Sequence, residues 1–243
     1  MWQKIWQKKG ENQQAQNENG RFSLKELLSI NGYDTSGNAL NEQGFVAHAH
    51  YVGKLCNLQN GSSSLLEIGC GAGVYLKLYD EFNKNLNISA LDYSQSLIDV
   101  AQKVIPRGTF YCAEAAKVGQ TFAGKSFDCI ICCGVVIYFP NKEYAFDVMQ
   151  QAYHLLKKGG NLAFLDLNDS ATKDIYHQQR RGVLSVEEYQ NKYKNLDHLF
   201  LDRQEVFDFF NQLGFEKIIV EDQHIEGYIN NPCRFNVFAI GKK

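Results

Sequence analysis

A glycine-rich segment at residues 65–73, LLEIGCGAG, has the residue types and spacing that point most directly to ligand binding. Glycines let the backbone bend tightly and approach a ligand without a side chain in the way, and a helix that starts behind them offers free N–H groups. A dinucleotide site uses the spacing G-x-G-x-x-G, but Val74 stands where the third glycine would be. The acidic Glu67 is poorly placed beside a pyrophosphate. The segment therefore favours a ligand that carries an ammonium group and no phosphate.

The elements that position this segment alternate between strands and helices. Apolar runs predict strands, and apolar residues at helical spacing predict helices. The predicted strands are residues 64–68, 87–91, 109–112, 127–133 and 161–166, and the predicted helices are residues 45–56, 74–82, 95–104 and 144–156. Ser94 is the expected cap of the helix that starts at residue 95, and Gly159 and Gly160 are expected to end the fourth helix. This order predicts a mostly parallel sheet with helices on both faces, which binds ligands at the carboxyl ends of its strands.

The last third of the chain departs from this alternation. Residues 167–201 are polar, contain several tyrosines and are expected to hold a helix over residues 186–193. Beyond them the sequence predicts one more helix and two β-rich runs, at residues 206–213, 215–220 and 235–240. No helix fits between the two β-rich runs, so we expect them to pair antiparallel.

The glycine-rich segment resembles the first motif, E-x-G-x-G-x-G, of class I S-adenosylmethionine-dependent methyltransferases. Further parts of that family's core follow in order: Asp92 at the end of the second strand, residues 112–115, the fourth strand at residues 127–131, and the turn at residues 155–160. The resemblance covers residues 45–165. It implies a Rossmann-like, doubly wound sheet of seven strands, mostly parallel with an antiparallel C-terminal strand, and a lid-like insertion at residues 167–201.

The resemblance also implies the cofactor S-adenosylmethionine, with S-adenosylhomocysteine as product. In the family, the acidic residue after the second strand holds the two ribose hydroxyls, and a carboxylate is suited to accept two O–H donors. That role falls on Asp92. Glu114 replaces the aspartate that the family usually places against the adenine. The residues implied at the cofactor are Glu67, Gly69, Cys70, Gly71, Gly73, Asp92, Tyr93, Glu114, Ala115 and Cys133.

The acceptor of the methyl group is expected near the ends of the fourth and fifth strands. Tyr138 and Phe139 follow the fourth strand, and an aromatic face tolerates the positive charge that develops on an amine. The expected catalytic residues are Tyr138, His198 and Asp166, and the expected substrate-binding residues are Phe139, Asn168, Arg180, Arg181, Tyr228 and Arg234. Ordinary packing or a solvated surface is the alternative for several of them. The pattern favours methylation of a small-molecule amine.

Composition limits the classes of partner and of location. The formal net charge of −2 gives no overall basic field for nucleic acid or acidic membranes. No run approaches the roughly 20 apolar residues of a membrane helix, and the first residues do not resemble a signal peptide. The seven cysteines are expected to be reduced thiols of a cytoplasmic protein. Cys129 and Cys132 form a C-x-x-C inside an apolar run, so buried strand cysteines are expected rather than a metal site.

Two parts of the chain are distinguished by composition. Residues 1–44 are expected to form an N-terminal head, a polar linker and a cap, and residues 45–243 the methyltransferase domain. Trp2 and Trp6 stand ahead of the polar residues 10–20. They predict a segment that docks on the body of the protein and either closes a site or covers core. The sequence does not indicate the oligomeric state.

Other functions make different demands on the sequence. Enzymes that methylate exocyclic amines of bases usually carry Asp/Asn-Pro-Pro-Tyr/Phe after the fourth strand, where residues 133–136 read CGVV. The Pro-Cys of enzymes that make 5-methylcytosine occurs only at residues 232–233, in the final hairpin. Without a basic stripe, a nucleic-acid substrate is disfavoured. Val74 and the antiparallel tail argue against a nicotinamide-dependent oxidoreductase. Small-molecule O-methylation and a non-catalytic cofactor-binding role stay open.

Overall fold

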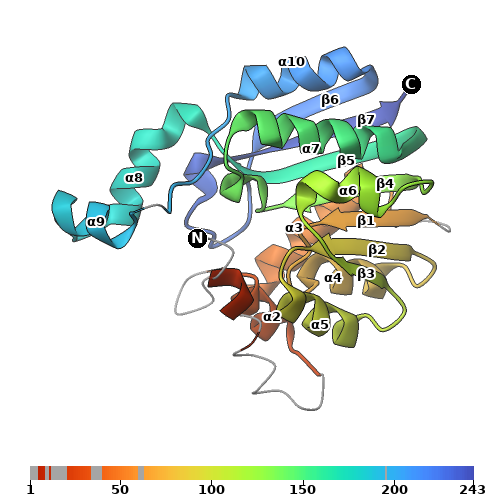
Figure 1. The fold of residues 1–243 in the computed structure, drawn as a ribbon, viewed down its shortest axis with the longest axis horizontal. Coiled ribbons are helices and arrows are strands. Elements are labelled where there is room, and N and C mark those ends of the chain that lie inside the picture. The colour runs from red at the N-terminus through yellow and green to blue at the C-terminus, as the bar shows by residue number, and fades with distance from the viewer. Residues whose placement is uncertain (1–4, 9–10, 12–20, 34–39, 60–62, 195) are drawn as a thin grey trace.

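A computed structural model describes residues 5–8, 11, 21–33, 40–59, 63–194 and 196–243. Within these residues, seven strands form one sheet in the order β3-β2-β1-β4-β5-β7-β6 (Figure 1). The strands are β1 (Ser64–Ile68), β2 (Asn87–Asp92), β3 (Thr109–Cys112), β4 (Phe127–Cys133), β5 (Leu156–Asn168), β6 (Phe215–Asp222) and β7 (Arg234–Lys242). β7 pairs antiparallel with β5 and β6, and the other neighbours pair parallel. The predicted sheet is confirmed.

Helices cover both faces of this sheet (Figure 1). Besides the helical residues 5–8, the α-helices of the described chain are α2 (Leu24–Ile30), α3 (Glu42–Leu55), α4 (Val74–Phe82), α5 (Gln95–Val104), α6 (Val118–Thr121), α7 (Lys142–Leu155), α8 (Lys173–Arg181), α9 (Val186–Lys192) and α10 (Arg203–Leu213). Helices α2 to α5 bury side chains such as Leu27 and Phe45 in one hydrophobic core. Helices α6, α7 and α10 bury side chains such as Val148 and Phe210 in a second core. Because apolar side chains are buried against both of its faces, the sheet forms the middle of three layers.

The turn between β1 and α4 lies where the strand order reverses, since β2 and β4 flank β1 on opposite sides. Gly69 in this turn has a φ of 75°, a backbone conformation that costs glycine little. A Cβ at this position would collide with the side chain of Val135, which follows β4. Glycine therefore lets the end of β1 lie directly against the end of β4, at the edge of the sheet where ligands bind in such folds.

One expectation about a helix end was wrong, and another was confirmed in position only. Gly159 and Gly160 do not end α7, because α7 stops at Leu155 and the next residue is already extended and paired with Phe127. The two glycines lie inside β5, at an irregularity in its pairing with β4. Ser94 does occupy the N-cap position of α5, but its hydroxyl makes no cap hydrogen bond to that helix.

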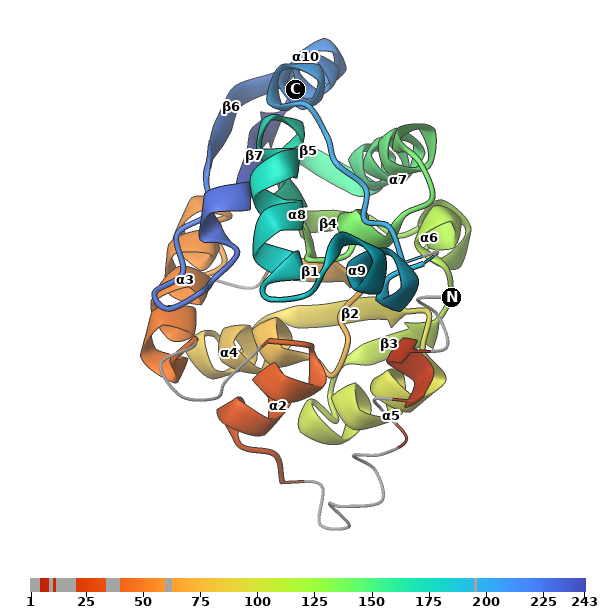
Figure 2. The same cartoon turned by 90° about the vertical axis from the view of Figure 1, so that its left-hand side faces the viewer.

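The insertion between β5 and α10 holds two helices where one was expected. α9 lies at the predicted position, and α8 precedes it. Tyr176 is the only buried residue of α8, whose sequence is KDIYHQQRR. The helix therefore has no apolar stripe by which it could be predicted. Seen from the carboxyl edge of the sheet, α8 and α9 lie in front of the strands and above α2 (Figure 2).

The N-terminal residues are described in part. Trp2 and the predicted linker, apart from residue 11, lie outside the described residues. Trp6 is described and packs against the first core. Among the helices of the described chain, none combines the length and apolar character needed to cross a membrane.

Candidate active site

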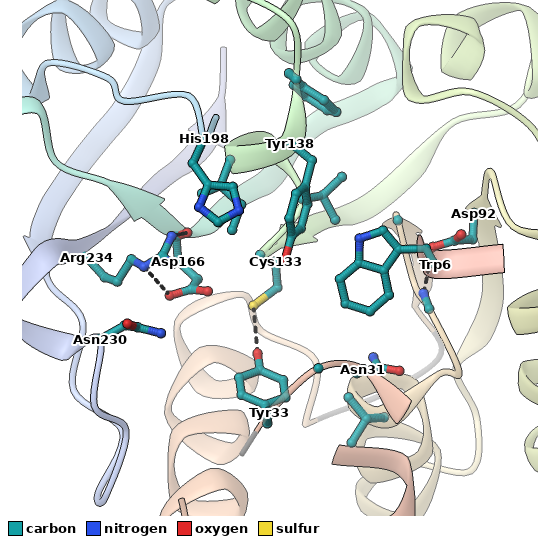
Figure 3. Close-up of a pocket in the computed structure, with 18 of the residues that line it drawn as sticks. Trp6, Asn31, Tyr33, Asp92, Cys133, Tyr138, Asp166, His198, Asn230 and Arg234 are labelled. Carbon is teal, nitrogen blue, oxygen red and sulfur yellow. Dashed lines mark hydrogen bonds and ion pairs between the residues drawn. The ribbon is translucent and has the colours of Figure 1, made fainter. Parts of the chain in front are cut away.

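A cavity of about 1120 Å³ opens at the carboxyl ends of the parallel strands. Residues of the glycine turn and of the loops after β2 and β3 line one part of it, which we call the cofactor part. Residues that follow β4, Asp166 of β5, and residues of α8 and of the loop before β7 line the other, which we call the substrate part. Figure 3 shows the labelled side chains of both parts turned toward a common space.

The carboxylate of Asp92 is held in the cofactor part by the backbone. Its Oδ2 accepts a hydrogen bond from the Gly71 N–H at 2.9 Å, and its Oδ1 accepts one from the Ser94 N–H at 2.9 Å. Burial raises the pKa of Asp92, and the backbone N–H groups oppose this shift. The carboxylate oxygens keep unused lone pairs, so the side chain is fixed in place and can still accept hydroxyl donors.

Glu67 presents a buried carboxyl group that lacks a donor. Its side chain lines the cavity, and within the described chain its Oε2 has no hydrogen-bond partner. Burial and the nearby charge of Asp92 raise the pKa of Glu67 well above its usual value. A buried acceptor without a partner is costly, and a ligand ammonium group would supply the missing donor. These two acids therefore fit a cofactor that carries an amino group and a ribose, as S-adenosylmethionine does.

Asn31, which the sequence analysis missed, fastens the cap to the glycine turn. It ends α2, its Oδ1 accepts a hydrogen bond from the Ala72 N–H at 2.8 Å, and its Nδ2 donates to the Cys70 carbonyl at 3.4 Å. Tyr33 lies two residues on, and its hydroxyl is 3.8 Å from the Sγ of Cys133. Both side chains line the cavity. No motif spacing marks them, because the contacts span about 40 and 100 residues.

Asp166 lies at the centre of the substrate part. It is 3% exposed, and its Oδ2 accepts a hydrogen bond from the Tyr228 hydroxyl at 3.0 Å. The Nε of Arg234 is 3.5 Å from its Oδ1, and the Arg234 Nη1 donates to the Asp166 carbonyl at 3.3 Å. Burial raises the pKa of Asp166, while Arg234 and Tyr228 oppose the shift. A carboxylate, a guanidinium group and a phenol thus form one buried cluster facing the cavity.

The backbone of Asp166 is unusual for a residue other than glycine. Its φ is 60°, in the left-handed region, which aspartate and asparagine tolerate better than other side chains. The pairing of β5 with β7 shifts register between Phe164 and Leu167, and the Asp166 N–H donates to the Asn236 Oδ1 at 2.9 Å. Such outliers persist where the surroundings hold them. The bulge turns the carboxylate toward the cavity instead of leaving it in the strand alternation.

His198 is a neutral imidazole in the wall of the substrate part. Its Nδ1 is hydrogen-bonded to the Tyr176 hydroxyl. Burial lowers the pKa of His198 to about 3, and the charges of Arg180 and Arg234 push in the same direction. Its ring meets that of Tyr138 edge to face, with centroids 5.2 Å apart. The insertion therefore contributes an uncharged nitrogen base and aromatic surface to the cavity.

The cavity is lined by residues from all three predicted sets: cofactor-binding, catalytic and substrate-binding. The residues that line it are Glu67, Gly69, Gly71, Asp92, Tyr93, Glu114, Ala115, Cys133, Tyr138, Phe139, Asp166, Arg180, His198, Tyr228 and Arg234. Their roles toward a ligand stay predictions. Trp6 also lines the cavity, in keeping with the expected docking of the N-terminal segment.

Four candidates do not line the cavity: Cys70, Gly73, Asn168 and Arg181. Cys70 is buried, with its thiol directed at the Gly71 carbonyl. Asn168 was expected to bind substrate, but it is 1% exposed and its Nδ2 donates to the Leu199 carbonyl at 2.9 Å. Asn168 therefore fastens the insertion to β5.

His48 of α3, and Cys129 and Cys132 of β4, have side chains that could take part in chemistry, but they are buried in the protein away from the cavity lining. His48, on α3, is hydrogen-bonded through its Nδ1 to the Tyr75 hydroxyl at 2.9 Å, and burial lowers its pKa to about 4. Cys129 and Cys132 are fully buried in the two cores, as expected for strand cysteines. In the part of the chain that the structure describes, no cluster of three or more histidine, cysteine or acidic side chains is arranged to hold a metal ion.

Comparison with known proteins identifies related sequences for the central part of the chain. Residues 66–162 match the family model described as a methyltransferase domain. The chain is 34% identical over 113 residues to the tRNA N(3)-methylcytidine methyltransferase trm140 of Schizosaccharomyces pombe, which covers 44% of this chain and 37% of that protein. It is 25% identical over 171 residues to the demethylmenaquinone methyltransferase of Thermotoga maritima, with 65% and 72% covered.

The match to the first curated relatives is confined to a part of each of them. The chain spans 37% of the length of trm140, and 15% of the tRNA (carboxymethyluridine(34)-5-O)-methyltransferase alkbh8 of Xenopus tropicalis, to which it is 30% identical over 106 residues. The shared sequence is therefore that of one domain in larger proteins.

Solved structures share the fold at low sequence identity. The plantazolicin methyltransferase BpumL, in complex with a triazolic desmethylPZN analog and SAH, superposes with a TM-score of 0.62 at 16% identity over 99% of this chain and 98% of that chain. The N-methyltransferase NodS from Bradyrhizobium japonicum WM9, in complex with S-adenosyl-L-homocysteine, gives a TM-score of 0.60 at 15% identity over 93% of this chain and 100% of that chain.

Proposed function

This chain carries a methyltransferase domain in the class I S-adenosylmethionine-dependent methyltransferase fold, and from that premise we propose that it methylates the amine nitrogen of a small molecule. The observation that carries the choice of acceptor is the buried carboxylate of Asp166, which faces a cavity walled by tyrosines. Residues 45–243 form the methyltransferase domain in this proposal, and residues 167–201 form its substrate lid.

The cofactor part supports the proposed use of S-adenosylmethionine. Asp92 offers a fixed carboxylate for the ribose hydroxyls. Glu67 offers an acceptor for the cofactor's amino group, because its Oε2 finds no donor within the described chain. Gly69 keeps the turn free of a Cβ that would fill the space beside Val135. When bound, the cofactor supplies a methyl group on a positively charged sulfur.

In the substrate part, the protein must position the acceptor nitrogen and stabilise the positive charge that develops on it. A neutral amine attacks without prior loss of a proton and becomes positively charged as the new N–C bond forms. Asp166 provides negative charge beside that nitrogen, and the tyrosine rings favour a cation over their faces. The Tyr228 hydroxyl and Arg234 hold the carboxylate in one orientation. Positioning of this kind is the main contribution that a protein makes to a displacement reaction.

Methylation of a hydroxyl oxygen is the second candidate, and His198 is the observation that favours it. A hydroxyl group must lose a proton as it attacks, so a general base assists the reaction. His198 lines the substrate part, and its pKa, lowered to about 3, leaves the imidazole unprotonated near neutral pH but makes it a weak base. Its tautomer decides whether the second ring nitrogen accepts a proton. The amine is preferred because the carboxylate of Asp166 would repel an alkoxide or phenolate.

A small molecule is proposed as the substrate although two of the relatives described above are named for tRNA. Those relatives match less than half of this chain. The formal net charge of −2 gives no general attraction to phosphates. The substrate part is also lined by α8 and by the loop before β7. Transfer of radioactive methyl groups to a panel of amines, and to total tRNA in a parallel reaction, tests this choice directly. Label in tRNA alone would contradict it.

Thermal unfolding with S-adenosylmethionine, S-adenosylhomocysteine and NAD, each added separately, tests the cofactor assignment. A ligand at about 100 times its Kd stabilises the folded state by about 2.7 kcal/mol. In a chain of this size, that raises the melting temperature by about 5 to 10 °C. We expect this rise with both adenosyl compounds and none with NAD. A rise with NAD alone would replace the methyltransferase proposal with an oxidoreductase.

Tyr138→Phe is expected to lower turnover about tenfold and to leave the Kd for S-adenosylhomocysteine nearly unchanged. The substitution keeps the ring that packs against Trp6 and His198, and removes only the hydroxyl from the cavity wall. A hydrogen bond to substrate is worth about 0.5 to 1.5 kcal/mol. Steady-state kinetics at saturating cofactor measures the effect. Tyr111→Phe, on β3 and away from the cavity lining, is the matched control and should behave as wild type.

A further inference from the structure

The N-terminal segment, residues 5–8, is hydrogen-bonded to the start of α5, just after Asp92 at the end of β2. The Gln7 carbonyl accepts a hydrogen bond from the Ser96 hydroxyl at 2.7 Å, and the Gln7 Oε1 accepts one from the Ser94 hydroxyl at 3.1 Å. The two serine hydroxyls also lie 3.0 Å apart. These contacts explain why Ser94, at the N-cap position of α5, makes no cap hydrogen bond to that helix. Its hydroxyl is used to hold a segment 87 residues away in the sequence.

The same segment places Trp6 inside the cavity. Trp6 is partly buried, lines the cavity and meets the ring of Tyr138 edge to face, with centroids 5.5 Å apart. Figure 3 shows its indole between Asp92 in the cofactor part and Tyr138 in the substrate part. The Ser94 N–H that donates to Asp92 belongs to the residue whose hydroxyl holds Gln7. The contacts of the segment and those of the proposed ribose acceptor therefore converge on Ser94, between β2 and α5.

We propose that residues 5–8 form a strap that closes over the bound cofactor, with Trp6 covering the junction of the cofactor part and the substrate part. The inference rests on the proposed function, because that function assigns the ligand beneath Trp6. An indole here buries apolar surface of the cofactor and excludes water from the transfer site, where exclusion strengthens every electrostatic contact. Because coupling between two binding events is reciprocal, the docked strap raises the affinity for cofactor, and cofactor stabilises the docked strap.

Calorimetric titration with S-adenosylhomocysteine tests the strap through a set of variants of the full chain. Trp6→Ala is expected to raise the Kd about tenfold, in line with the loss of an aromatic contact and its buried area. Trp6→Phe should retain most of the affinity. Ser96→Ala, which removes a hydrogen bond to the strap without changing the cavity lining, should raise the Kd about threefold. Lys8→Ala is the matched control, because Lys8 is exposed on the same segment, and it should bind as wild type does.

A fluorescence measurement reports on the strap itself. The chain has two tryptophans, Trp2 and Trp6, so Trp2→Phe leaves Trp6 as the sole emitter. We expect acrylamide to quench Trp6 less after saturation with S-adenosylhomocysteine. If the wild type binds this compound and Trp6→Ala binds equally or more tightly, or quenching does not change, the strap is wrong and the cofactor assignment stands. If the wild type does not bind the compound, the proposed function fails and the strap fails with it.

Discussion

An Asp92→Ala variant is expected to bind S-adenosylhomocysteine at least about a hundredfold more weakly than the wild type. The carboxylate is oriented by the Gly71 and Ser94 N–H groups, and two ribose hydroxyls would complete its hydrogen bonds. Hydrogen bonds to a charged group contribute about 1.5 to 3 kcal/mol each, and about 1.4 kcal/mol corresponds to a factor of ten in Kd. Isothermal titration calorimetry measures the change.

The substitution also removes the acceptor for two backbone N–H groups, so the effect on folding must be measured separately. An unpaired buried donor costs about 1 to 3 kcal/mol, and the thermal unfolding of the variant without ligand gives that cost. Asp92→Asn is the matched variant, because its amide oxygen still accepts one hydrogen bond. We expect its Kd to lie between those of the wild type and Asp92→Ala. A folded Asp92→Ala protein with a Kd within threefold of the wild type would show that Asp92 does not hold the ribose.

An Asp166→Asn variant is expected to lose at least about a hundredfold in turnover while its affinity for S-adenosylhomocysteine stays near that of the wild type. Asparagine is compatible with the φ of 60° at this position, so the backbone can be retained. The change removes the negative charge that would face the developing ammonium group. Loss of one group that stabilises developing charge typically costs about 10² to 10³ in rate. Steady-state kinetics at saturating cofactor gives the result.

Arg234 makes a control necessary for this prediction, because it is 3% exposed and would be left without its counterion. Removing one partner of a buried ion pair costs about 3 to 5 kcal/mol. The double variant Asp166→Asn/Arg234→Met removes both charges, and we expect it to regain melting temperature but not turnover. A single variant whose turnover drops less than tenfold would contradict the role of Asp166 toward an amine and would favour the oxygen acceptor beside His198.

The cofactor part was predictable from sequence because short segments carry it. Glu67 lies in β1, the glycine turn follows β1, and Asp92 ends β2, and the apolar pattern of both strands is clear. The helices and strands of this region begin and end within two residues of the predicted positions, apart from α3, which starts three residues early, and β5, which starts five residues early. The difference in β5 arose because Gly159 and Gly160, which resemble a helix terminator, lie instead within a strand irregularity where pairing with β4 decides the conformation.

The substrate part was predictable only as a set of residue types. Tyr138, Asp166 and Arg234 come from three elements, and their meeting depends on the bulge that gives Asp166 its left-handed backbone. No local pattern encodes that conformation. The contacts of Asn31 with the glycine turn and of Gln7 with Ser96 join residues far apart in the chain, so spacing could not reveal them. Asn168 shows the opposite case. It lies at the expected strand end, but its side chain is hydrogen-bonded to the Leu199 carbonyl instead of lining the cavity.

The position of β7 between β5 and β6 has a consequence for how the protein is made. A chain emerging from a ribosome supplies the glycine turn and Asp92 first, and it reaches Arg234 more than 60 residues after Asp166. Until residues 234–242 arrive, β5 has an unpaired edge, and unpaired edges invite association with other chains. The growing chain can therefore assemble the cofactor part early, while Asp166 still lacks its counterion Arg234. A chain interrupted before β7 would lack that counterion and would present the open edge of β5 to its neighbours.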